Sequence, residues 1–253
     1  MTPLMIAALG ALMVATAFLS GLFGMAGGMI LIGVLLVLMP LPAAMVLHAI
    51  TQMASNGWRA FLWRAHIVWR PVFVYFLGCA IALSLWSLIR YVPDKPVALL
   101  LLGATPFMAR LMPKDLKPDP ASIWQGAVYG SICMGLMLMT GVIGPLLDTY
   151  FLGGNMDRRG IIATKATCQV GSHLTKLIYF GGIIDSAASL NPVLVPVAIA
   201  ASMLSTTLSR RLLEAMSDAQ FRRWANHLIT TVAGYYLLYG GWLLVAKSTA
   251  APY

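Results

Sequence analysis

Apolar segments of membrane-spanning length recur along this sequence, and they leave room for few other architectures. A straight helix needs about 20 predominantly apolar residues to cross a bilayer. Of the 253 residues, 60% are hydrophobic and only 10% are charged, which is too little charge to cover a soluble protein of this size. The sequence therefore predicts an all-α polytopic membrane protein with the lipid bilayer as a partner.

The apolar pieces divide into two halves of five. They run roughly over 4–23, 26–39, 43–63, 71–91 and 95–112, and then over 122–140, 143–153, 158–181, 189–209 and 221–246. The polar stretch 113–120 between them is the predicted hinge loop. It would separate a first membrane repeat at 1–112 from a second at 121–253.

One piece in each half is too short for a straight span. The stretches 26–39 and 143–153 contain 14 and 11 residues, and they follow the glycine clusters Gly24-Met-Ala-Gly27-Gly28 and Gly141-Val-Ile-Gly144-Pro145. Backbone broken at membrane depth is tolerated only where it lines protein or a cavity. We therefore expect each half to open with a Gly-broken re-entrant helix pair, followed by three transmembrane helices.

The loop cations predict the orientation of these halves. If each Gly-broken pair turns back on itself, the second half is inverted, and 11 loop cations lie on one side of the membrane and 3 on the other. If each pair instead forms one continuous span, the division is 8 to 6. The larger group is Arg64, Arg70, Arg110, Lys114, Lys117, Arg158, Arg159, Arg210, Arg211, Arg222 and Arg223, and the smaller is Arg90, Lys95 and Lys247. Because cytoplasmic loops are enriched in Lys and Arg, the count favours two inverted repeats with both termini outside. The same bias explains the net charge of +9 without a nucleic-acid partner.

Two helical segments carry the same polar stripe, 117 residues apart. The stripes place polar residues at i, i+4, i+7, i+8 and i+11: His48, Gln52, Ser55, Asn56 and Arg59, then Lys165, Gln169, Ser172, His173 and Lys176. At about 3.6 residues per turn, each set lies along one helix face. The same shift places Gly24-x-x-Gly27 on Gly141-x-x-Gly144. Duplicated polar stripes and Gly breaks in a membrane protein predict a transporter with its site between the halves.

These motifs resemble the sulfite exporter TauE/SafE family. The first half has Gly21-Leu-Phe-Gly24-Met-Ala-Gly27-Gly28 and, later, Arg64-Ala-His66-Ile-Val-Trp69; the second has Gly141-Val-Ile-Gly144-Pro145 and Tyr179-Phe-Gly-Gly182-Ile-Ile-Asp185. The resemblance covers nearly the whole chain. It implies secondary transport, usually export, of sulfite or small organosulfur and carboxylate anions across the bacterial inner membrane, which would make the outer termini periplasmic.

The predicted site holds a small anion without a metal or another cofactor. A helix N-terminus offers unpaired N–H groups and about half a unit of positive charge, and we expect two such ends to follow the Gly breaks. The predicted substrate-binding residues are Gly24, Gly27, Gly28, Thr51, Gln52, Ser55, Asn56, Arg59, Gly141, Gly144, Lys165, Thr167, Gln169, Ser172, His173 and Lys176.

Each of these residues also has a structural alternative. The polar side chains could join helices by hydrogen bonds, and Arg59 and Lys176, each about one turn from a helix end, could extend to the membrane interface. Lys165 lies roughly 12 Å into its segment at ~1.5 Å per residue, where such extension is less favourable. Asp148, the only acid inside an apolar piece, is the first proton-coupling candidate or a partner for Lys165, and His48 is the second.

Enzymatic motifs are missing from the sequence, which has no HExxH, GxSxG, Walker or paired-carboxylate arrangement. Its three cysteines lie in apolar segments and form no CxxC pair, so no metal site is expected. The rival hypothesis is a non-transporting integral-membrane assembly or interaction protein, in which the stripes pair with each other in a dry core. Either kind of protein could form a homo-oligomer.

Overall fold

The computed structural model describes residues 2–23, 26–111, 119–120, 122–152, 156–184 and 191–249. These residues form helices and no strand, so the all-α prediction is confirmed. The helices are α1 (Pro3–Phe23), α2 (Ala26–Leu38), α3 (Leu41–Leu62), η1 (Arg64–His66), α4 (Trp69–Ile89), α5 (Lys95–Leu111), α6 (Ile123–Thr140), α7 (Gly144–Leu152), α8 (Arg158–Ile178), η2 (Tyr179–Ile183), α9 (Leu194–Ala215) and α10 (Asp218–Thr249).

Four of the described helices are long and apolar enough to cross a membrane: α1, α4, α6 and the 223–249 part of α10. The helices α3 and α8 carry the polar stripes and are correspondingly less apolar. The predicted hinge at 113–120 falls mostly on residues 112–118, which lie outside the described part of the chain. The division into two repeats at this hinge therefore stays a prediction.

The chain reverses direction after α1. A Cβ atom added to Gly27 would lie on the carbonyl oxygen of Thr16 and 2.6 Å from the backbone nitrogen of Ser20, so the start of α2 packs back against α1. The helix α2 begins at Ala26, as expected from the short apolar piece 26–39. Gly27 and Gly28 lie in its first turn, and Gly27 has no room for a Cβ because it lies so close to α1.

A similar reversal follows α6. This helix ends at Gly141, whose φ of +83° favours glycine and whose N–H donates to the carbonyl of Met137. The helix α7 then returns along α6, since the ring of Tyr150 stacks on that of Tyr129 at 4.9 Å and its hydroxyl donates to the carbonyl of Pro120. Both short helices therefore double back on the helix before them.

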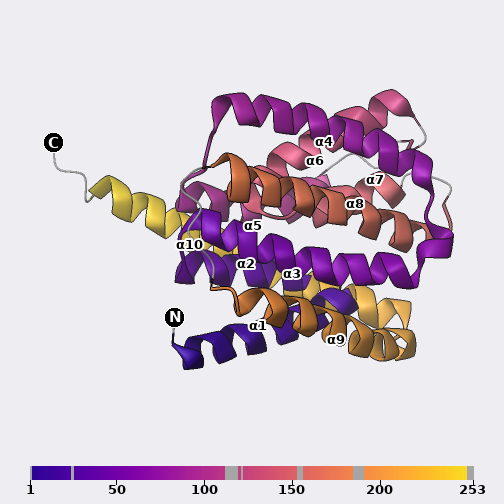
Figure 1. The fold of residues 1–253 in the computed structure, drawn as a ribbon, viewed down its shortest axis with the longest axis horizontal. Coiled ribbons are helices and arrows are strands. Elements are labelled where there is room, and N and C mark those ends of the chain that lie inside the picture. Colours follow the sequence, from indigo (N-terminus) through magenta and orange to yellow (C-terminus); the bar gives the residue numbers. More distant parts are fainter. Residues whose placement is uncertain are drawn as a thin grey trace.

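The ten described α-helices form two groups of five, α1–α5 and α6–α10. If each helix is exchanged for the helix at the same place in the other group, the pairs that pack together stay the same. α1 packs on α9 as α6 packs on α4, while α3 packs on α8 and α5 on α10. The α3–α8 pair is antiparallel, because Val46 lies beside Gly181 and Gly57 beside Val170. The α5–α10 pair is antiparallel as well, with Asp94 near the start of α5 bonded at 2.7 Å to Lys247 near the end of α10. The start of α1 and the end of α10 lie on the same side of the molecule (Figure 1).

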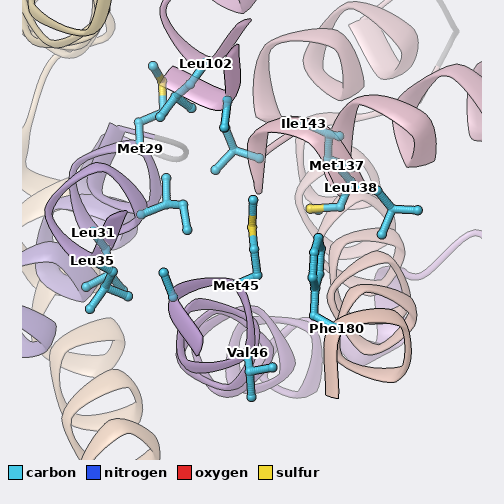
Figure 2. Packing of buried hydrophobic residues seen from close by; sticks show 14 of the residues in the cluster. Met29, Leu31, Leu35, Met45, Val46, Leu102, Met137, Leu138, Ile143 and Phe180 are labelled. Carbon is cyan, nitrogen blue, oxygen red and sulfur yellow. The ribbon is translucent and has the colours of Figure 1, made fainter. Parts of the chain in front are cut away.

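A buried apolar cluster surrounds the two Gly breaks. Figure 2 shows Met45 of α3 between Met29 of α2 on one side and Met137 of α6 and Phe180 of η2 on the other. A Cβ on Gly141 would lie 2.9 Å from Ile32 of α2 and 3.0 Å from the sulfur of Met45. The second break therefore packs directly against the short helix that follows the first.

Candidate functional site

The two polar stripes meet beside these breaks through one lysine and one histidine. Lys176 of α8 and His48 of α3 are both completely buried, and Lys176 Nζ lies 2.7 Å from His48 Nδ1. The same ammonium donates to the carbonyl of Gly141 at 3.0 Å. The antiparallel packing of α3 on α8 brings these side chains together although they are 128 residues apart.

His48 extends this contact to the first break. Its Nε2 lies 3.0 Å from the carbonyl oxygen of Gly28, which can only accept a hydrogen bond, so Nε2 carries the proton. Nδ1 then keeps its lone pair and accepts from Lys176 in a neutral imidazole. A single hydrogen-bonded chain thus runs from Gly28 through His48 and Lys176 to Gly141; we call these four residues the junction.

The two stripe cations at matching positions each reach the C-terminal end of a helix. Lys176 donates to Gly141 just past the end of α6, and Arg59 donates to the carbonyl of Ser20 in the last turn of α1 at 3.0 Å. Helix C-termini carry unpaired carbonyls and partial negative charge, which favours cations there. The described partners of Lys176 are an imidazole nitrogen and a peptide carbonyl, so none of them carries a full negative charge.

Two buried polar atoms face the first turn of α2 without a hydrogen-bond partner among the described residues: Gln52 Nε2 and Ser20 Oγ. A Cβ atom added to Gly28 would lie 3.3 Å from the Gln52 carboxamide. A Cβ atom added to Gly27 would lie 2.6 Å from Ser20 Oγ. A buried donor left unpaired costs about 1–3 kcal/mol. This side of the junction therefore offers hydrogen-bond donors to an additional group.

His173 borders the junction from α8. Its ring meets the ring of His48 edge to face, with centroids 5.4 Å apart, and its Nδ1 also has no partner among the described residues. His173 precedes Lys176 by three residues, so both side chains lie on the same helix face. The structure thus brings together Gly27, Gly28, His48, Gln52, Gly141, His173 and Lys176 of the predicted set.

Other stripe residues make the hydrogen bonds of the packing alternative. Ser55 bonds to Thr206 of α9 at 2.9 Å, and Ser172 bonds to Tyr75 of α4 at 2.8 Å. Three side chains donate to carbonyls four residues earlier in their own helices: Thr51, Asn56 and Thr167. These contacts join or stiffen helices, and a binding role for these five residues stays a prediction.

The depths of the two stripe lysines are the reverse of what their positions suggested. Lys176 is 0% exposed, so its extension to the membrane interface is excluded here, whereas Lys165 is only partly buried. The reason is that α8 continues into η2, where Tyr179 and Phe180 are themselves buried, and the end of the helix lies inside the protein. Gln169, between the two lysines, is buried.

The structure gives less information on three other predicted site residues. Gly144 begins α7, as predicted for a helix N-terminus next to the second break. Gly24 and the side chain of Asp148 lie outside the described residues, so the roles of Gly24 in binding and of Asp148 in proton coupling stay predictions. Ser20 was missed in the sequence, where its one signal is a hydroxyl directly before the run Gly21-Leu-Phe-Gly24.

Comparison with known families decides the class of protein. The profile of the family described as Sulfite exporter TauE/SafE matches residues 8–236. The chain belongs to this family. It is therefore a multi-pass membrane protein of a transporter family, and the four apolar helices agree with this class. No match was found among curated proteins or among solved structures.

Proposed function

We propose that this TauE/SafE family member is a secondary transporter that exports a small anion, such as sulfite, an organosulfonate or a small carboxylate, across the bacterial inner membrane. The observation that carries the proposal is the junction, in which a fully buried lysine is bonded to Gly141 at the second break and, through His48, to Gly28 at the first. A charge at bilayer depth costs a few kcal/mol and marks substrate or ion pathways. Family membership disfavours the rival, a non-transporting assembly protein.

The donors around the junction match the chemistry of an oxyanion. Lys176 supplies positive charge, while Gln52 Nε2 and Ser20 Oγ supply donors that the described protein leaves unused. The first turn of α2 adds N–H groups that have no partner within the helix. In the bound state Lys176 exchanges the carbonyl of Gly141 for the anion.

The helix packing supports two inverted repeats with α2 and α7 as re-entrant helices. When the two groups of five helices are exchanged, α3 takes the place of α8 and α5 takes the place of α10, so each of these two pairs consists of helices that replace one another. Both of these pairs are antiparallel. A two-fold axis that relates antiparallel partners is perpendicular to them, so it lies in the plane of the membrane, as in many transporters. The distribution of loop cations favours periplasmic termini under this arrangement.

Binding of the anion is expected to stabilise the protein against heat. A ligand present at 100 times its Kd stabilises the folded state by about 2.7 kcal/mol. We expect sulfite, alkyl sulfonates or small carboxylates to raise the unfolding temperature of the purified protein in detergent, with chloride at equal ionic strength as the control. Failure of every anion in such a panel to raise it would contradict a binding site at the junction.

A further inference from the structure

One face of α9 carries buried hydroxyl groups that the junction does not include. The face, here called the hydroxyl face, consists of Ser202, Ser205, Thr206 and Ser209, which are spaced as one helix side and are each at most 4% exposed. The opposite side of the same helix is apolar and open, since Leu204 is 58% exposed and Leu208 is 50% exposed. The hydroxyl face therefore points into the protein, away from lipid.

The hydroxyl face packs on the helices that carry the unpaired donors. Thr206 bonds to Ser55 of α3, and Gly21 of α1 lies against the side chain of Ser209. Close packing alone explains why small residues such as Gly, Ser and Thr occur at this helix contact. Two hydroxyls of the face, on Ser202 and Ser205, however, have no hydrogen-bond partner among the described residues.

Unpaired serine hydroxyls are unusual in a membrane helix because a simple alternative exists. Ser84, Ser87 and Thr105 of this protein donate to the carbonyl four residues earlier. Ser202 and Ser205 do not use this solution. Lipid offers no hydrogen bonds, so each buried unpaired group at membrane depth is costly unless a polar occupant satisfies it.

The corresponding contact in the other half is closed. The α4–α6–α8 contact is the counterpart of α9–α1–α3, and Ser172, which matches Ser55, is bonded there to the phenol of Tyr75. Gly78 of α4 lies against the backbone of α6 at Gly130. Each of these three helices also contributes one buried cysteine: Cys79, Cys133 and Cys168. Only one of the two contacts is thus lined by unpaired serine hydroxyls in the described structure.

We propose that the hydroxyl face lines the route by which a hydrated oxyanion moves between the junction and one side of the membrane. The inference rests on the proposed function and adds a path to it. The route runs from Gln52 past Ser55 and Thr206 to Ser209, beyond which α9 continues with Arg210 and Arg211, two of the cations predicted to be cytoplasmic. Hydroxyl groups suit an anion in transit, because they donate hydrogen bonds without adding a charge that would trap it.

Cysteine modification tests the route in the full-length protein. Ser202→Cys and Ser205→Cys are nearly isosteric changes, and Leu204→Cys places a thiol one residue away on the lipid side. In membrane vesicles, an anionic sulfonate-bearing methanethiosulfonate reacts only with thiols that water reaches. We expect both serine variants to react at least about tenfold faster than Leu204→Cys and than the three native cysteines of the unmodified protein. The faster reaction is expected in inside-out vesicles, which expose the cytoplasmic side.

Reaction rates for both serine variants that equal those of the native cysteines would overturn the route. Faster reaction in right-side-out vesicles would overturn its cytoplasmic orientation. Because the modification needs no substrate, it is independent of the transport measurement. Unreactive variants with normal anion flux would refute the route alone, whereas reactive variants without any anion flux would refute the transport function and leave a water-filled path.

Discussion

Replacement of Lys176 by methionine is expected to reduce anion transport at least about a hundredfold while the protein remains folded. Methionine has a similar length but removes the only described cation at the junction, together with the donors to His48 and Gly141. In the proposed complex Lys176 and the anion form a buried charge pair; removing one partner of such a pair costs about 3–5 kcal/mol, and each 1.4 kcal/mol is about tenfold in affinity. Anion flux in proteoliposomes and the unfolding temperature in detergent are the two measurements.

Stability and transport should separate in this variant. Apolar residues in place of buried charges are often neutral or stabilising, so the unfolding temperature should stay equal or rise. Lys247→Met is the matched control, because Lys247 is exposed and its ion pair with Asp94 contributes only about 0–1 kcal/mol. Normal transport by Lys176→Met would contradict a role in binding, and a lower unfolding temperature in the same variant would show that the lysine only joins helices.

Gly27→Ala is expected to prevent correct folding of the first half. The added Cβ would lie on the carbonyl oxygen of Thr16 and 2.6 Å from the backbone nitrogen of Ser20. Backbone atoms of two packed helices cannot move aside as a flexible side chain can. Overpacking in a core typically costs about 1–3 kcal/mol, and here we expect at least the upper end of that range. The yield of monodisperse protein and its unfolding temperature measure the effect.

Gly234→Ala is the matched control for this substitution. Gly234 also lies inside a helix, but nothing stands within 4 Å of its added Cβ. Alanine is favoured over glycine in a helix by about 0.5–1 kcal/mol, so the control should be neutral or slightly stabilising. Equal stability of Gly27→Ala and Gly234→Ala would contradict the close packing of α2 on α1 from which the reversal at the first break is inferred.

The sequence predicted those features that depend on local patterns. Apolar length and the Gly clusters predicted the positions of the two short helices, which the structure places at Ala26–Leu38 and Gly144–Leu152. The matched spacing of the stripes included two of the four junction residues, His48 and Lys176, because residues four apart in a helix share a face whatever packs on it; their role in binding stays a prediction.

The rest depended on tertiary contacts that one-dimensional spacing does not contain. Distance from a helix end suggested that Lys165 is deeper than Lys176, but the continuation of α8 into η2 buries the end of the helix instead. The hydroxyls of Ser202 and Ser205 were overlooked for a similar reason. In a sequence they resemble ordinary small residues of an apolar helix, and only the packing of α9 on α1 and α3 shows that they lack partners.

The central claim is that the junction of Lys176, His48 and the two Gly breaks carries a small anion across the membrane. Its most direct test is the flux of radiolabelled sulfite and alkyl sulfonates into proteoliposomes that contain the unmodified protein, Lys176→Met or Lys247→Met. The account predicts saturable flux of at least one of these anions for the unmodified protein and for Lys247→Met, and its near-complete loss for Lys176→Met. Saturable flux that is equal in all three proteins, or flux in none of them, would contradict it.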